Sequence, residues 1–272
     1  HDMKALLLFL VTLYIVPLQA QTAKRNLSRK LTLHPSSYES GNGASVVWHP
    51  VLKKYITARA GNISYPMDVF DANGVKQNEE KIETGFDIRG MWYDTKRKRL
   101  MVNGYSTSGW GWFSISKKGL PDSVHVLFEG MNQPDEQIAG CYNPLRDQVL
   151  FLYGFQVVAY HPERGEPLGE TAIVDLTKGI SQVLQVDFNG DYSEFPDDLN
   201  STMAFTGIPG KEIAILNKTD QCIHLFSIKT GLPTQLLQLP KDAKPQGFLC
   251  FAYANGYYFL YDKDEKNWIG YK

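Results

Sequence analysis

Short runs of hydrophobic residues, separated by turn residues, recur along the chain after residue 21. These runs are rich in Val, Ile, Tyr and Phe, and Gly, Pro, Asn and Asp lie between them. No segment in this part keeps the helical period of about 3.6 residues. Short apolar runs bounded by such residues are typical of β-strands joined by tight turns. The pattern therefore predicts an all-β chain.

One unit recurs along the chain: a small residue, a few apolar residues, an aromatic, a polar turn and an apolar strand. Its copies are "GASVVWHPVLKKYITA", "IRGMWYDTKRKRLMVNG", "IAGCYNPLRDQVLFLYG", "STMAFTGIPGKEIAILN" and "GFLCFAYANGYYFLYD". The anchoring aromatics are Trp48, Tyr93, Tyr142, Phe205 and Tyr253. In the first three copies the second strand is predicted to begin at a constant distance from the aromatic, at Tyr55, Leu100 and Val149. A third strand and a more polar fourth strand follow in most copies.

Four antiparallel strands in a repeat of about 40–50 residues form one blade of a β-propeller. From about Leu31 to its end the chain resembles the broad β-propeller repeat class, with "VFDANG" and "LFSIKTG" as strand-turn units. The resemblance implies five blades, with "RKLTLHP", Arg29–Pro35, closing the last blade so that its edge is covered. The interval from Tyr142 to Phe205 is longer than the others, and residues 175–199 are interpreted as an insertion. A sixth, degenerate blade is the alternative for this interval, and a β-sandwich does not explain the regular repeat.

The first 20 residues have the composition of a secretory signal peptide. A lysine precedes the apolar run Ala5–Val16, and small residues follow it, which predicts cleavage after Ala20. The two residues before Met3 are interpreted as residues added by cloning or as the result of a wrongly assigned start of the chain. The apolar run is too short for a comfortable membrane span. We therefore expect a secreted or periplasmic protein in which residues 21–272 form a single domain, with no stable membrane span.

The charges and the cysteines narrow the classes of partner. Lys and Arg number 28 against 29 Asp and Glu, so the basic excess of a nucleic-acid-binding protein is absent. The basic run Lys96–Arg99 lies between two predicted strands and is expected to be a solvated turn. Cys141, Cys222 and Cys250 are odd in number and lie in apolar runs, which predicts buried free thiols instead of disulfides or a zinc site. No cofactor is predicted.

One face of a propeller carries two kinds of loop, those that lead into each inner strand and those that join the second strand to the third. We call it the top face. The glycine-rich segment "NGYSTSGWGW", Asn103–Trp112, joins the second and third strands of the second repeat, so we expect its aromatics there. Loop aromatics beside polar groups suit a sugar or a peptide. The residues predicted to bind such a ligand are Arg59, Tyr65, Asp87, Arg89, Tyr105, Trp110, Gln137, Tyr153, Asn200 and Gln246.

The two tryptophans of this segment receive different predictions. Strand alternation is taken to turn one inward and the other outward. Trp112 begins a strand and is expected to pack between blades, whereas Trp110 is expected to be partly exposed and to contact the ligand. Trp110→Ala is accordingly predicted to spare folding, and Trp112→Ala to destabilise the protein.

Evidence for catalysis or for a metal is weak in this sequence. No G-x-S-x-G elbow, H-E-x-x-H, P-loop or dinucleotide fingerprint occurs. Asp87 and Glu136 can converge at the channel mouth, as the carboxylate pair of a glycosidase does. Side chains with oxygen ligands alternate at Asp187, Asn189, Asp191 and Ser193, with Asp198 further on. This spacing resembles a calcium loop, but its glycine is misplaced, and an acidic surface insertion is the favoured interpretation.

Together these features predict a non-catalytic binding or scaffolding propeller. Its partner is expected to be a glycan, a peptide or another protein on the top face. The alternative is a propeller-fold glycoside hydrolase or lyase that acts on an extracellular polysaccharide. The enzyme is less favoured because no sharp catalytic motif is present. The sequence leaves the identity of the ligand and the oligomeric state open.

Overall fold

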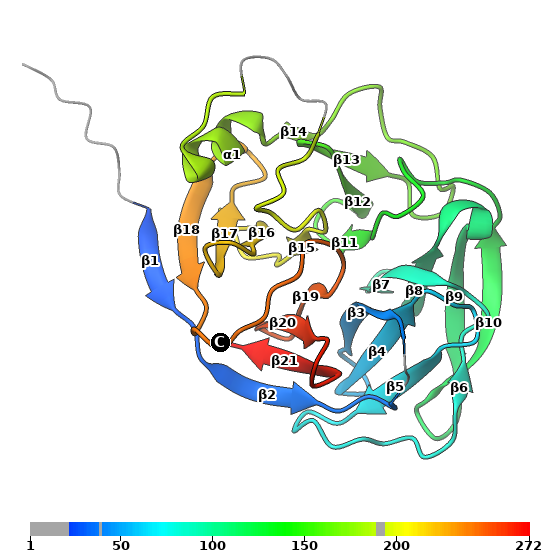
Figure 1. Ribbon diagram of the computed structural model, residues 1–272. Coiled ribbons are helices and arrows are strands. Elements are labelled where there is room, and N and C mark those ends of the chain that lie inside the picture. The colour runs from blue at the N-terminus through cyan, green and yellow to red at the C-terminus, as the bar shows by residue number, and fades with distance from the viewer. Residues whose placement is uncertain (1–21, 38–39, 189–193) are drawn as a thin grey trace, which may run out of the picture.

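A computed structural model describes residues 22–37, 40–188 and 194–272, so the expected signal segment lies outside the described residues. Within these residues five sheets surround a central axis as the blades of a β-propeller (Figure 1). From the centre outward, blade 1 consists of β3 (Asn42–His49), β4 (Lys54–Ala60), β5 (Pro66–Phe70) and β6 (Ile82–Glu83). Blade 2 consists, in the same order, of β7 (Ile88–Asp94), β8 (Arg99–Gly104), β9 (Trp110–Ile115) and β10 (Pro121–Phe128). Blade 3 is β11 (Cys141–Asn143), β12 (Gln148–Tyr153), β13 (Gln156–Tyr160), β14 (Val174–Asp175).

Blades 4 and 5 complete the ring. Blade 4 consists of β15 (Ala204–Phe205), β16 (Ile213–Asn217), β17 (Cys222–Phe226) and β18 (Pro233–Gln238). Blade 5 consists of β19 (Phe251–Ala254), β20 (Tyr257–Asp262), β21 (Asn267–Tyr271) and β2 (Arg29–Leu33). The remaining elements are β1 (Ala23–Asn26), the 3₁₀ turn η1 (Ser106–Ser108) and the helix α1 (Thr177–Leu184). The predicted five-bladed, all-β fold is confirmed.

The strand register confirms the repeat that the sequence predicted. Each anchoring aromatic pairs with the first or second residue of the second strand of its blade. The pairs are Trp48 with Tyr55, Tyr93 with Leu100, Tyr142 with Val149, Phe205 with Ile213 and Tyr253 with Tyr258. The five aromatics therefore occupy equivalent places on the inner strands.

The N-terminal strands close the ring at two blades. As predicted, β2 pairs antiparallel with β21 and becomes the outer strand of blade 5. The preceding strand β1, which was not predicted, pairs parallel with β18 of blade 4. Between them, the backbone N–H of Leu27 donates to Gln238 and that of Ser28 donates to Lys272. This segment therefore joins blades 4 and 5 and covers both of their outer edges.

The long interval between blades 3 and 4 holds an insertion and, within the described residues, no sixth sheet. Its helix α1 lies at the periphery between β14 and β18 (Figure 1). Leu176 and Ile180 are fully buried in the hydrophobic cluster shared by blades 3 and 4. Phe188 and Phe195 pack on Phe155, with ring centroids 4.9 and 5.7 Å apart. The insertion thus folds onto the loop between β12 and β13.

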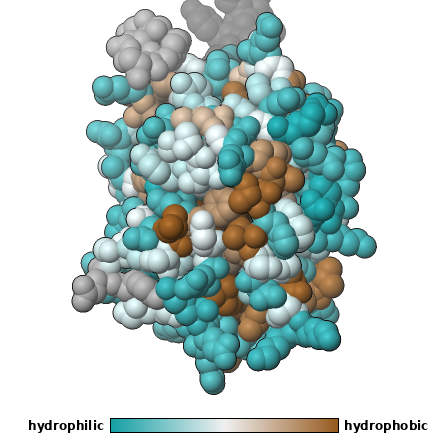
Figure 2. Space-filling model, turned by 90° about the vertical axis from the view of Figure 1, so that its right-hand side faces the viewer, coloured by the Kyte–Doolittle hydropathy of each residue, from teal (hydrophilic) through white to brown (hydrophobic). Residues whose placement is uncertain are grey.

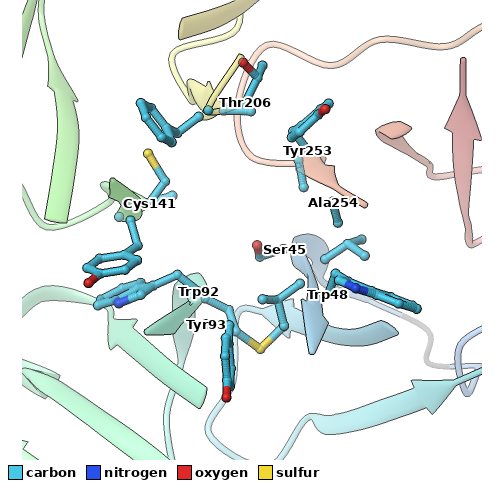
Figure 3. A pocket seen from close by; sticks show the side chains of 18 of the residues that line it. Ser45, Trp48, Trp92, Tyr93, Cys141, Thr206, Tyr253 and Ala254 are labelled. Carbon is cyan, nitrogen blue, oxygen red and sulfur yellow. The ribbon is translucent and has the colours of Figure 1, made fainter. Parts of the chain in front are cut away.

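Each blade buries both faces of its sheet against its neighbours, and the channel at the centre is bounded by the inner strands. Val47 of β3 and Met91 of β7, for example, belong to one buried cluster of blades 1 and 2. Figure 3 shows Trp48, Tyr93 and Tyr253 spaced around the open centre. The face at which each inner strand turns into the second strand is called the bottom face.

The basic turn between β7 and β8 was predicted to be solvated, and for Arg97 this is wrong. Its side chain is only 12% exposed and donates to Asp94 and, across the blade boundary, to Asp147 at 2.8 Å. Lys96 pairs with Asp147 at 2.6 Å and Arg97 also pairs with Glu163 at 3.1 Å. Carboxylates on the next blade hold Arg97 out of solvent, whereas Lys96 stays exposed, and the turn links blades 2 and 3.

The outer surface and the cysteines complete the description. Figure 2 shows a band of hydrophobic residues on the side of the molecule where β10 lies, and Val126 of β10 is 53% exposed. Cys141, Cys222 and Cys250 are free thiols, as predicted, although Cys141 is half-buried and not fully buried. In the described part of the chain, no helix combines the length and apolar character needed to cross a membrane.

Candidate functional site

Two adjoining clefts open on the top face, with volumes of about 700 and about 500 Å³. Gln137 and Phe248 line both clefts, so the two form one continuous depression, which we call the top-face groove. The larger cleft lies beside blade 3 and the smaller beside blades 1 and 2, where Arg89 forms part of its wall. Clefts of this size accommodate small molecules or short segments of a polymer.

A tight turn of blade 3 supplies one wall of the groove. Tyr153 and Gln156 are paired across the β12–β13 hairpin, and Gly154 takes a positive φ of 57° in the two-residue turn between them. Such turns favour glycine because it has no Cβ to oppose a positive φ. The hairpin leaves Tyr153 51% exposed at the groove. An exposed aromatic ring therefore stands in a cleft on a rigid scaffold.

The insertion supplies the facing wall, through Asp175, Thr177 and Phe195. The Asp175 carboxylate accepts a hydrogen bond of 2.7 Å from the backbone N–H of Thr177. Burial opposes ionisation of Asp175, but hydrogen bonds from Thr177 and Gln156 outweigh it and lower the pKa of the carboxyl. Asp175 is therefore a fixed negative charge at neutral pH. With Gln137, Gln156 and the exposed Asp135, the groove offers carboxylate and amide groups close to Tyr153.

Several of the predicted residues meet at the centre of the top face. Arg89 is the hub of this cluster: its Nη1 contacts Asp87 Oδ1 at 2.5 Å and its Nε donates to Gln137 Oε1 at 2.9 Å. The guanidinium also lies 4.8 Å from the ring centroid of Tyr105, a cation–π contact. The arginine thereby fixes the orientation of Gln137, which the two clefts share.

The candidate catalytic carboxylates, Asp87 and Glu136, are both engaged by donors of the protein. Asp87 accepts from Arg89 and from the backbone N–H of Gly61 at 2.6 Å. Glu136 accepts from the hydroxyl of Tyr105 at 3.2 Å, and this hydrogen bond raises the pKa of Tyr105. Neither carboxylate is among the residues that line the groove.

The other predicted top-face residues make contacts within the protein. The Arg59 side chain is 3% exposed and donates to the hydroxyl of Tyr261. The Tyr65 hydroxyl lies 2.8 Å from that of Ser40. Asn200 is fully buried, and its amide donates to the backbone carbonyls of Gln246 and Leu249. These side chains hold loops and blades together at the rim of the channel.

Trp110 is buried, so the prediction that it is partly exposed is wrong. Its exposed fraction is 0%, and it contacts the rings of Trp92, Phe128, Phe151 and Tyr160. β9 already begins at Trp110, and residues two apart on a strand share a face. Trp110 and Trp112 therefore pack on the same side, toward blade 3, instead of on opposite sides. Trp112 is the half-buried member, stacked on His125 with ring centroids 4.2 Å apart.

The candidate calcium loop falls mostly outside the described residues. Asn189, Asp191 and Ser193 belong to the segment that the structure does not describe. Asp198 accepts a hydrogen bond of 2.6 Å from Thr219. Among the described side chains, no group of three or more His, Cys, Asp or Glu is arranged to hold a metal ion.

Sequence reasoning named Arg89, Gln137 and Tyr153 but missed several groove residues. Asp135 and Phe248 lie within two positions of residues that were named, and Gln156 lies three positions after Tyr153, so a wider window at each loop would have included them. The residues from the insertion have no counterpart in the repeat. The repeat pattern therefore held no signal for them.

Comparisons with known proteins agree with the fold and assign no family. No protein-family model matches the sequence, and no curated protein matches it by sequence. The crystal structure of the glutaminyl cyclase from Myxococcus xanthus aligns with a TM-score of 0.52 and 9% identity, over 93% of this chain and 98% of that one. A gluconolactonase from Xanthomonas campestris aligns with a TM-score of 0.41 and 10% identity, over 89% of this chain and 87% of that one. The likeness to the first supports the fold alone.

Proposed function

We propose that this protein is a non-catalytic binding propeller whose top-face groove holds a glycan or a peptide. The observation that carries the proposal is Tyr153, a large aromatic that is 51% exposed inside a cleft lined by Asp135, Gln137, Gln156 and Asp175. An aromatic face beside fixed hydrogen-bonding groups matches a ligand that has both apolar faces and hydroxyl or amide groups.

The distribution of carboxylates supports binding over catalysis. Hydrogen bonds from Arg89, Gly61 and Tyr105 occupy the carboxylates of Asp87 and Glu136. Neither side chain lines the groove, where a catalytic acid would have to stand. A hydrolase remains the second candidate on one specific observation: Asp135 and Asp175 both line the larger cleft. Hydrolysis of a glycosidic bond requires one carboxyl that can donate a proton. The lowered pKa of Asp175 does not suit that role.

Glycan and peptide arrays test this proposal most directly. The protein, Ser201→Tyr and Ser201→Ala would be applied to the same arrays. Ser201 is half-buried in the groove wall, so a tyrosine there fills the groove while alanine leaves it open. We expect binding by the parent and by Ser201→Ala, and loss of binding in Ser201→Tyr. Binding that Ser201→Tyr retains would contradict the location of the site.

Turnover assays on a polysaccharide panel distinguish binding from catalysis. We expect no turnover by the parent. Hydrolysis or elimination that disappears in Asp87→Asn, Glu136→Gln or Asp135→Asn would replace the binding function with an enzymatic one. Each of these substitutions keeps the size of the side chain and removes only its charge.

We further propose that the protein works outside the cytoplasm. This proposal rests on the basic residue, the apolar run and the small-residue site before Gln21. Intact-mass analysis of the protein after export is expected to give a chain that begins at Gln21. A mature chain that retains the apolar run would contradict this proposal.

A further inference from the structure

A second cavity lies on the bottom face, at the centre of the ring, with a volume of about 350 Å³. All five anchoring aromatics line it, and Figure 3 shows three of them, Trp48, Tyr93 and Tyr253, around the opening. It shares no lining residue with the top-face groove. We call it the bottom-face cavity.

Contacts between neighbouring blades line the channel between these two sites. The backbone N–H of Cys250 donates to the carbonyl of Gly43 at 2.9 Å, which joins blades 5 and 1. The Asn103 side chain accepts from the N–H of Gly140 at 2.9 Å and joins blades 2 and 3. A Cβ on Gly90 would clash with the Gly140 nitrogen, so the strands approach closely here. The bottom-face cavity is a site of its own because it shares no lining residue with the top-face groove.

The wall of the bottom-face cavity carries no charged side chain among the described residues. An ionic ligand would lose its hydration there without gaining a counter-charge, which is strongly unfavourable. The aromatic, Met91 and Val47 side chains offer apolar contact instead. The chemistry of the wall thus selects an uncharged ligand.

Hydrogen-bonding groups are nevertheless present at the centre. Figure 3 shows the Ser45 hydroxyl directed into the open middle of the ring. Within the described residues this hydroxyl has no hydrogen-bond partner in the protein. Each inner strand is also paired on one side only, so its other edge presents backbone N–H and C=O groups toward the channel. A ligand here can form hydrogen bonds as well as apolar contacts.

We propose that the bottom-face cavity binds a small, uncharged, ring-containing molecule with at least one hydrogen-bonding group that reaches Ser45. Its volume is at the lower end of the range of about 300–1,000 Å³ that small-molecule sites occupy. The ring of the ligand lies among the anchoring aromatics, and its polar group meets the Ser45 hydroxyl and the strand edges. This site goes beyond the proposed function and is independent of the top-face ligand.

Fluorescence titration with prodan, a neutral dimethylaminonaphthalene ketone, tests the proposal. Dimethylaminonaphthalene sulfonate, an anion with the same ring, is the matched control probe. We expect saturable binding of one prodan per chain with a blue-shifted emission, and binding of the sulfonate at least about tenfold weaker, because its charge finds no partner. No saturable binding of prodan, or equal binding of both probes, would overturn the proposal.

Four variants locate the bound probe. Ser45→Leu fills the cavity, and Thr95→Trp covers its rim from an exposed position, where folding is not at risk. We expect each to weaken prodan binding about tenfold or more, while Tyr153→Ala in the top-face groove leaves it unchanged. Ser45→Ala, which removes only the hydroxyl, is expected to weaken binding several-fold. Binding that survives both Ser45→Leu and Thr95→Trp, or that Tyr153→Ala removes, would place the probe elsewhere and refute the site. Melting temperatures show that each variant is folded.

Discussion

Replacing Trp110 with alanine should destabilise the fold strongly. The indole is fully buried and lies between blades 2 and 3, with ring centroids 5.4 Å from Trp92 and 5.1 Å from Phe128. Truncation of a buried Trp to Ala typically lowers stability by about 3–5 kcal/mol, since a cavity is left behind. Because the indole N–H has no hydrogen-bond partner among the described residues, we expect the loss to come from packing alone. Trp110→Phe, which keeps a ring and removes this unpaired donor, should lose clearly less.

Trp112→Ala is the matched control on the same face of β9. Trp112 stacks on His125 and lies 4.7 Å from the Arg99 guanidinium, and it is only half-buried. Contacts of this kind contribute about 1 kcal/mol each, so we expect a loss of about 1–2 kcal/mol. The order of the two effects is therefore the reverse of the one that the sequence predicted.

Equilibrium unfolding in urea gives the free energy of unfolding of each variant. In a protein of this size about 1 kcal/mol shifts the melting temperature by roughly 2–4 °C, so Trp110→Ala should melt on the order of 10 °C below the parent. A loss below about 1 kcal/mol for Trp110→Ala, or a larger loss for Trp112→Ala, would refute the assignment of Trp110 to the core.

Two further predictions concern charge and pH. Burial lowers the pKa of His224 to about 4, so the folded state excludes a proton that the unfolded state binds below about pH 6.5. In urea unfolding, the free energy of unfolding should fall by up to about 3 kcal/mol as the pH drops from 6.5 to 4. This dependence on pH should be weaker in His224→Gln, and an unchanged dependence would contradict the lowered pKa of His224. Hydrogen bonds from Arg97 hold the pKa of Asp147 well below its ordinary value, so its contribution is present at neutral pH and is lost in acid. Asp147→Asn should reduce stability at pH 7 by about 1–3 kcal/mol, whereas Asp122→Asn, at an exposed position, should change it little; equal effects would contradict an inter-blade role for Asp147.

The repeat made the fold predictable, since one aromatic fixes the place of a whole blade. Trp48, Tyr93 and Tyr142 pair where the spacing predicted, and the closing strand begins at Arg29 as expected. The burial of Trp110 was not predictable from the glycines around it. Its burial depends on whether β9 begins at Trp110 or Trp112, and a two-residue shift in that boundary moves the ring from loop to core.

The candidate site could be predicted only in part. Arg89, Gln137 and Tyr153 lie where inner strands begin or where second strands end, positions that the repeat defines. Asp175 and Phe195 come from the insertion, whose path depends on packing against Phe155 and not on any repeat. Phe248 precedes an inner strand and, by sequence alone, does not differ from a core residue.

The dissociation constant of the strongest array ligand, measured by calorimetry for the parent and for Tyr153→Ala, tests the groove most directly. Leu145→Ala is the control, because Leu145 is 78% exposed on the bottom-face turn of the same blade. Loss of a stacked aromatic ring is expected to weaken binding about tenfold, and Leu145→Ala should leave it unchanged. An unchanged dissociation constant for Tyr153→Ala in a folded protein would contradict the assignment of the top-face groove as the binding site.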